Sequence, residues 1–150
     1  MSATYVKNLI HLVYSTKHRE RRIIKSCQAG LWKYQAGIFK NLDSPAIIIG
    51  GIEDHIHALF SLSKNYALTK VIEEVKKGSS KWMKSDGPRD PAFYWQRGYA
   101  AFSVSVSAAP DVDLYIKNQF ERHLKLSFQD EIRLLCKHHG VELDERYAWD

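Results

Sequence analysis

The order in which side-chain periodicities follow one another along the chain leaves few folds open. Strands are predicted at residues 5–15, 46–49, from 53 or 55 to 62, and 99–107, from the alternation of side chains or from the turn residues that bound them. Segments with the 3.6-residue period of a helix are predicted at 26–40, 68–84 and 110–139. The first six elements therefore predict an α+β fold, a ferredoxin-like βαββαβ sandwich, followed by one long C-terminal helix.

Local signals refine the predicted boundaries. Ser26 is a suitable cap for the first helix, and Gly50-Gly51 is expected to break the second strand. Gly140 is expected to end the last helix. The predicted apolar stripe of that last helix consists of Ile116, Phe120, Leu124 and Phe128. Apolar residues alternate on both sides of the first strand, so we expect both faces of the sheet to be at least partly covered.

Length and composition fit one globular domain over residues 1–150, with 45% hydrophobic residues. This excludes a disordered or collagen-like chain. Lys and Arg number 22 against 17 Asp and Glu, a net charge of +5 that favours an anionic partner without identifying it. Cys27 and Cys136 lie far apart and are expected to be small buried hydrophobes. Because no segment has the apolar length of a membrane span or a signal peptide, a cytoplasmic location is predicted.

His55 and His57 form the first candidate site. Residues two apart on a strand share a face, so the two imidazoles are expected to project together while Ile56 and Ala58 point into the core. Two adjacent imidazoles can hold a divalent metal. Taken alone, the pair is better explained as two polar side chains on a half-exposed strand.

Tyr115 and Gln119 form the second candidate site. They lie four residues apart, and therefore on one face, in the last predicted helix. That face is rotated away from the apolar stripe and is continued by Arg122 and His123. A tyrosine in such surroundings can meet a polar ligand, although a partly exposed tyrosine at the rim of the sheet is the commoner arrangement.

The two segments together resemble a known family, the small single-tyrosine HUH transposases of insertion sequences, of the IS-two-hundred type. The resemblance extends over almost the whole chain. Its blocks, in sequence order, are residues 11–17 (HLVYSTK), 54–57 (DHIH), 61–64 (SLSK), 79–82 (SSKW), 95–99 (WQRGY), 101–105 (AFSVS), 115–119 (YIKNQ), 127–131 (SFQDE) and 144–147 (DERY).

The resemblance implies a role for each candidate residue. His55 and His57 correspond to the metal-binding pair, Gln119 to the third protein ligand and Tyr115 to the nucleophile. It implies a divalent cofactor, Mg²⁺ or Mn²⁺, and a 5′-phosphotyrosine intermediate formed on single-stranded DNA at hairpin-marked ends. A homodimer is also implied, in which the tyrosine of one subunit can complete the site of the other. Arg122-His123 departs from the two adjacent histidines that the family often carries there, which leaves the role of this pair open.

Basic residues give candidate phosphate contacts. The candidates are Lys17, Arg19, Arg21, Arg22, Lys76, Lys77, Lys81, Lys84, Arg97 and Arg122. A solvated helix face explains the lysines equally well. Two other functions stay open: a domesticated relative that processes palindromic repeats of its host, and a non-catalytic nucleic-acid-binding module on the same βαββαβ framework.

Overall fold

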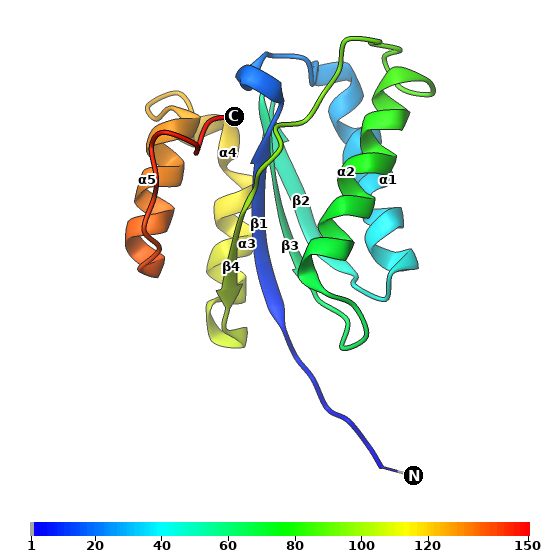
Figure 1. Ribbon diagram of the computed structural model, residues 1–150, viewed down its shortest axis with the longest axis vertical. Coiled ribbons are helices and arrows are strands. Elements are labelled where there is room, and N and C mark those ends of the chain that lie inside the picture. The colour runs from blue at the N-terminus through cyan, green and yellow to red at the C-terminus, as the bar shows by residue number, and fades with distance from the viewer. Residues whose placement is uncertain (1) are drawn as a thin grey trace.

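The computed structural model describes residues 2–150 and contains the six predicted elements in the predicted order (Figure 1). They are β1 (Leu9–Ser15), α1 (Lys25–Asn41), β2 (Ala46–Ile52), β3 (His55–Ser61), α2 (Leu68–Lys84) and β4 (Ala100–Val104). Three further helices follow, namely α3 (Ala109–Lys117), α4 (Gln119–Arg122) and α5 (Phe128–His139). Short 3-10 turns lie at Lys17–Arg19 and Val106–Ala108.

The four strands form one antiparallel sheet in the order β2-β3-β1-β4. Helices α1 and α2 cover one face, and the segment from α3 to α5 covers the other (Figure 1). Every residue of the central strand β1 is buried, so the prediction that both faces are covered is confirmed.

The larger part of the core lies between the sheet and α1–α2. It includes Leu12, Tyr14, Ile56, Ala58 and Phe60, all fully buried. Because side chains alternate along a strand, the β3 residues directly before and after Ile56 face the opposite side of the sheet. His55 and His57 therefore lie on the face covered by α3 to α5.

Several predicted boundaries were wrong. β1 begins at Leu9 instead of residue 5, and α1 is capped by Ile24 without a side-chain hydrogen bond, so Ser26 is not its cap. β2 continues through Gly50-Gly51, because these glycines pair with His57 and Ile56 of β3. β4 is shorter than predicted because the chain enters the Val106–Ala108 turn after Ser105, whose hydroxyl accepts a hydrogen bond from the Ala108 amide.

The prediction of one helix over residues 110–139 was also wrong. Asn118 leaves helical geometry (φ −96°, ψ 20°) and separates α3 from α4. Ser127 begins α5 by accepting a hydrogen bond from the backbone amide of Asp130. Phe120 and Leu124 of the predicted stripe are 53% and 70% exposed. Tyr115 consequently lies on the short helix α3, and α5 folds back toward the sheet.

No helix formed by residues 2–150 is long and apolar enough to cross a membrane. Cys27 and Cys136 are both buried and unpaired, as expected for small hydrophobic residues. Gly140 ends α5 in a left-handed conformation (φ 68°), which confirms the predicted stop.

Candidate metal centre and nucleophile

β3 places His55 and His57 side by side beneath the segment from α3 to α5. Their ring centroids lie 5.2 Å apart, and both residues are 0% exposed. The half-exposed strand that offered the simpler explanation of this pair is therefore absent. Burying two imidazoles is unfavourable unless their nitrogens find partners.

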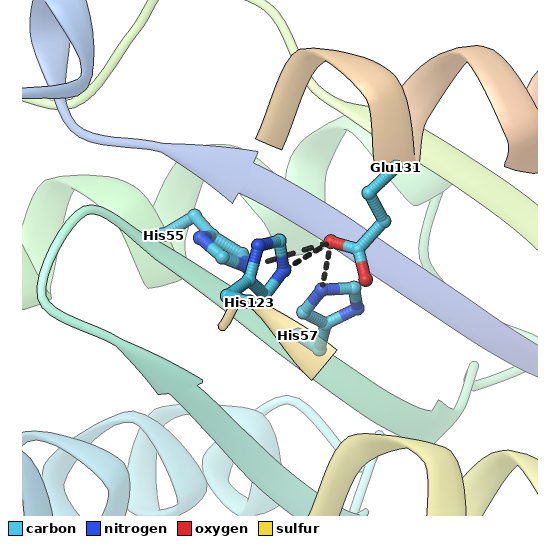
Figure 2. Close-up of side chains that lie close together, drawn as sticks. All are labelled: His55, His57, His123 and Glu131. Carbon is cyan, nitrogen blue, oxygen red and sulfur yellow. Dashed lines mark hydrogen bonds and ion pairs between the residues drawn. The ribbon is translucent and has the colours of Figure 1, made fainter. Parts of the chain in front are cut away.

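The partner that reaches both imidazoles is Glu131 of α5, which is 1% exposed (Figure 2). Its Oε1 lies 3.0 Å from His57 Nε2 and 3.4 Å from His55 Nε2. His123, from the turn after α4, brings a third Nε2 to 3.0 Å from the same oxygen. Three imidazoles from two parts of the chain thus converge on one carboxylate oxygen.

The Nδ1 atom of each imidazole has a hydrogen-bonding partner of its own. His55 Nδ1 lies 2.7 Å from Asp54 Oδ1, and His123 Nδ1 lies 2.6 Å from the Leu126 carbonyl. His57 Nδ1 lies 2.8 Å from Nε2 of His11. A neutral imidazole protonated at Nδ1 in such a contact keeps the lone pair of Nε2 for a metal, and partners of this kind orient metal-binding histidines.

The arrangement fits a divalent metal. Ligand atoms bonded to one ion at ~2.1 Å lie ~3.0 Å apart across an octahedral edge and ~3.4 Å apart across a tetrahedral edge. The distances from Glu131 Oε1 to the three Nε2 atoms match these values, and the four ligand atoms lie within 4.8 Å of one another. A buried group of His55, His57, His123 and Glu131 could therefore bind a divalent ion.

Gln119 and Tyr115 join the same cluster. Gln119 Oε1 lies 3.1 Å from His55 Nε2 and 3.0 Å from His123 Nε2, and its Nε2 donates to Glu131 Oε2 over 3.1 Å. The Tyr115 hydroxyl also donates to Glu131 Oε2. The structure thus brings together all four residues that the sequence singled out at the two candidate sites.

The electrostatics of the cluster follow from burial and from these contacts. Burial acts to lower the pKa of His55, but the carboxylates of Asp54 and Glu131 outweigh it and raise that pKa to about 9. Burial lowers the pKa of His57, and burial together with His57 lowers the pKa of His11 to about 3.

The surrounding imidazoles overcome the burial of Glu131 and hold its pKa far below the usual range. Burial and the Glu131 carboxylate raise the pKa of Tyr115.

Several predicted DNA contacts are engaged within the protein. Lys76 Nζ donates to the carbonyls of Gln96, Arg97 and Gly98 over 2.5, 3.2 and 3.0 Å, and burial lowers the pKa of Lys76 to about 8. Arg22 forms ion pairs with Glu20 and Asp90.

The other basic candidates differ in their contacts within the protein and in their exposure. Arg19 donates to the Trp149 carbonyl, and Arg21 lies 3.7 Å from Glu53. Lys77, Lys81 and Arg97 have exposed side chains, and Lys17 and Lys84 lie over the ring of Tyr94 at 5.8 and 4.0 Å. The Arg122 guanidinium lies 4.2 Å from the ring centroid of Tyr115, beside the cluster instead of on a distant surface.

The sequence reasoning gave no role to Glu131, His11 or Asp54, and it left His123 undecided. His123 had a local signal, because it follows Gln119 by four residues and continues the same face. Glu131 had a weaker signal in the sequence, because it is a charged residue on the helix face that carries the apolar Phe128, Ile132 and Cys136. His11 carries no local signal, because its partner His57 is 46 residues away on β3.

Comparison with known proteins identifies the family. The family model for IS200-like transposases matches residues 4–119, which include His55, His57, Tyr115 and Gln119. The chain belongs to this family. Membership supports a DNA-cleaving transposase, and the buried imidazole–carboxylate group makes metal binding by this family member plausible.

Two solved structures share the fold of this IS200-like transposase. One, from Deinococcus radiodurans R1 and assigned as a transposase, is 22% identical with a TM-score of 0.63, covering 79% of this chain and 96% of its own. The other, a REP-associated tyrosine transposase bound to a REP hairpin, is 12% identical with a TM-score of 0.60, covering 82% of this chain and 73% of its own. A search of curated proteins finds no match.

Proposed function

We propose that this chain is a transposase that cleaves and rejoins single-stranded DNA at hairpin-marked ends through a 5′-phosphotyrosine at Tyr115. The observation that carries the proposal is the convergence of the Tyr115 hydroxyl on the buried group of His55, His57, His123 and Glu131. A nucleophile beside side chains that could hold a metal ion is an arrangement suited to phosphodiester cleavage. We also propose that the framework is the ferredoxin-like sandwich of the sequence prediction, formed by residues 1–150 as one domain.

The side chains have distinct tasks in this proposal. Tyr115 supplies the attacking oxygen, and the Arg122 guanidinium, 4.2 Å from the centre of its ring, would supply a positive charge for the phosphate that Tyr115 attacks. His55, His57 and His123, with Glu131 and Gln119, would hold the divalent ion. That ion, Mg²⁺ or Mn²⁺, would withdraw charge from a non-bridging phosphate oxygen and orient the phosphorus when bound. Three imidazoles favour Mn²⁺ over Mg²⁺, which prefers oxygen ligands.

The proposed substrate is single-stranded DNA with hairpins. The hairpin bound by the REP-associated relative supports it, as does the net charge of +5. Exposed Lys77, Lys81 and Arg97, with Lys17 and Lys84 beside Tyr94, are the proposed phosphate contacts. The same relative keeps a second function under consideration, in which the chain processes palindromic repeats of its host.

The experiment is a covalent-adduct assay. Single-stranded DNA from both flanks of the chain's own gene is incubated with the protein and Mn²⁺ or Mg²⁺, and adducts are resolved by denaturing electrophoresis. Wild-type protein is expected to form the adduct, whereas Tyr115→Phe is not. Absence of an adduct on both flanks, or its persistence in Tyr115→Phe, would refute the proposal. A non-catalytic module predicts instead that replacing His55 and His57 by alanine leaves metal binding and DNA affinity unchanged.

We propose a homodimer as the working assembly, and a mixing experiment decides which subunit supplies the tyrosine. In the single chain, Tyr115 already contacts Glu131 of its own imidazole group, which favours action in cis. Mixed Tyr115→Phe and His57→Ala proteins are then expected to stay inactive. Recovery of the adduct in the mixture would show that Tyr115 of one subunit serves the histidines of another.

A further inference from the structure

The two carboxylate oxygens of Glu131 have different surroundings. Oε1 faces the Nε2 atoms of His55, His57 and His123, and Oε2 accepts hydrogen bonds from the Tyr115 hydroxyl and from Gln119 Nε2. The residue is 1% exposed, so bulk water does not compete for these contacts. One buried side chain therefore connects the imidazole group to the nucleophile.

We propose that Glu131 is a catalytic residue that accepts the proton of the Tyr115 hydroxyl during DNA cleavage. This inference depends on the proposed function, because it assumes that Tyr115 is the nucleophile. A general base must lie within hydrogen-bond reach of the proton that it removes, and Glu131 Oε2 meets this condition.

The step balances as follows. The Tyr115 proton moves to Glu131 Oε2 while the phenol oxygen forms a bond to phosphorus. The bond between phosphorus and the 3′ oxygen breaks, and that oxygen leaves with its electron pair and takes a proton from water. Glu131 then releases its proton to solvent. In the joining step Glu131 is again ionised, accepts the proton of the incoming 3′-hydroxyl, and returns a proton to the departing Tyr115 oxygen.

Other neighbours of Tyr115 are less suited to this task. Arg122 carries only donors and lies against the face of the ring. The rings of His57 and His11 lie edge-on to the tyrosine ring, with centroids 5.7 and 5.9 Å away. Both nitrogens of His57 and the Nε2 of His11 are engaged with partners other than the Tyr115 hydroxyl. Among residues 2–150, Glu131 is the acceptor to which the Tyr115 hydroxyl donates.

The first arm of the test compares Glu131→Gln with Asp130→Asn. Glutamine keeps the size of Glu131 and removes its ability to take a proton, while Asp130 is an exposed carboxylate one position earlier on α5. At saturating Mn²⁺, with metal affinity measured separately by calorimetry, Glu131→Gln is expected to slow single-turnover adduct formation by about 10²- to 10⁴-fold. Asp130→Asn is expected to match wild type.

The second arm replaces Tyr115 by a difluorinated tyrosine, whose hydroxyl is more acidic than that of tyrosine and therefore depends less on a base. This substitution is expected to restore at least tenfold of the rate lost in Glu131→Gln. A normal rate in Glu131→Gln would overturn the inference. So would a defect that the fluorinated tyrosine leaves unchanged, because Glu131 would then act only by holding metal or structure.

The outcome is distinguishable from failure of the proposed function, which would show as no adduct in wild-type protein. Circular dichroism reports whether Glu131→Gln folds. If it does not, the comparison is made with Glu131→Asp, which keeps a carboxylate on a shorter arm. Its defect is expected to be smaller and also to be rescued by the fluorinated tyrosine, and the absence of rescue would count against the inference.

Discussion

Gly50 controls how closely α3 approaches the sheet, and Gly50→Ala tests whether that distance matters for Tyr115. A Cβ added at Gly50 would lie 3.0 Å from Cγ2 and 3.1 Å from the backbone oxygen of Ile116, the residue after Tyr115. Ordinary contact begins at 3.4 Å. The Ile116 side chain can rotate, but the backbone of α3 must move away from β2.

The magnitude follows from that displacement. Restoring ordinary contact to the Ile116 oxygen shifts α3, and Tyr115 with it, by about 0.3 Å. If a misplacement of about 1 Å costs roughly 10²-fold in rate, a shift of about 0.3 Å costs roughly fourfold. Overpacking costs about 1–3 kcal/mol, and replacing a strand glycine by alanine returns about 0.5–1 kcal/mol, so the net loss of stability is about 0–2.5 kcal/mol.

The assay combines single-turnover adduct formation with urea unfolding. The matched control is Gly37→Ala on α1, where an added Cβ meets nothing within 4 Å. That variant is expected to gain about 0.5–1 kcal/mol and to cleave at the wild-type rate. A Gly50→Ala protein that cleaves DNA as fast as wild type, with unchanged urea midpoint, would refute the argument that this contact positions the nucleophile.

Three further predictions concern the metal centre and the buried lysine. Mn²⁺ at about a hundredfold its Kd is expected to raise the free energy of unfolding by about 2.7 kcal/mol, seen by calorimetry as a Tm increase of about 5–10 °C that His123→Ala reduces. Without metal, the raised pKa of His55, about 9, gives stability that is complete below pH ~6.5 and lost as the pH rises through 9. Urea titrations should show that the free energy of unfolding falls by up to about 3 kcal/mol between these two pH values. If His55→Gln shows no such dependence on pH, the His55 imidazole is the group responsible. Lys76→Ala leaves three carbonyls without their donor and should cost about 1–3 kcal/mol, whereas exposed Lys77→Ala should stay within about 0.5 kcal/mol.

Local periodicity predicted the fold well where each element buries one continuous face. The bounds of α2 were predicted correctly because Val71, Ile72 and Val75 all face the core. The prediction of one long helix failed because its apolar stripe does not bury one continuous face. Phe120 and Leu124 keep helical spacing in the sequence although they are exposed, so spacing alone does not reveal the breaks at Asn118 and before Ser127.

The candidate site was predictable where chemistry and local geometry coincide. Strand alternation placed His55 and His57 together, and helical spacing placed Tyr115 near Gln119. That these two pairs act together at one site followed only from the family resemblance. The contacts of His11 and Glu131 depend on how β1 and α5 pack against β3, which no short-range pattern encodes. The basic residues were the least predictable group, because charge alone does not distinguish exposed Lys77 from Lys76, which is engaged with backbone carbonyls.

The error in the last helix explains how one chain assembles the site. Tyr115 and Glu131 are 16 residues apart, and in a continuous helix they would lie about 24 Å from each other. The breaks after α3 and before α5 turn the chain back, so that the two side chains form a hydrogen bond above His57. His123 lies in the turn itself, held by the Leu126 carbonyl, and its Nε2 points at Glu131. The turn is therefore part of the site, because it supplies one imidazole and brings the carboxylate to the other two.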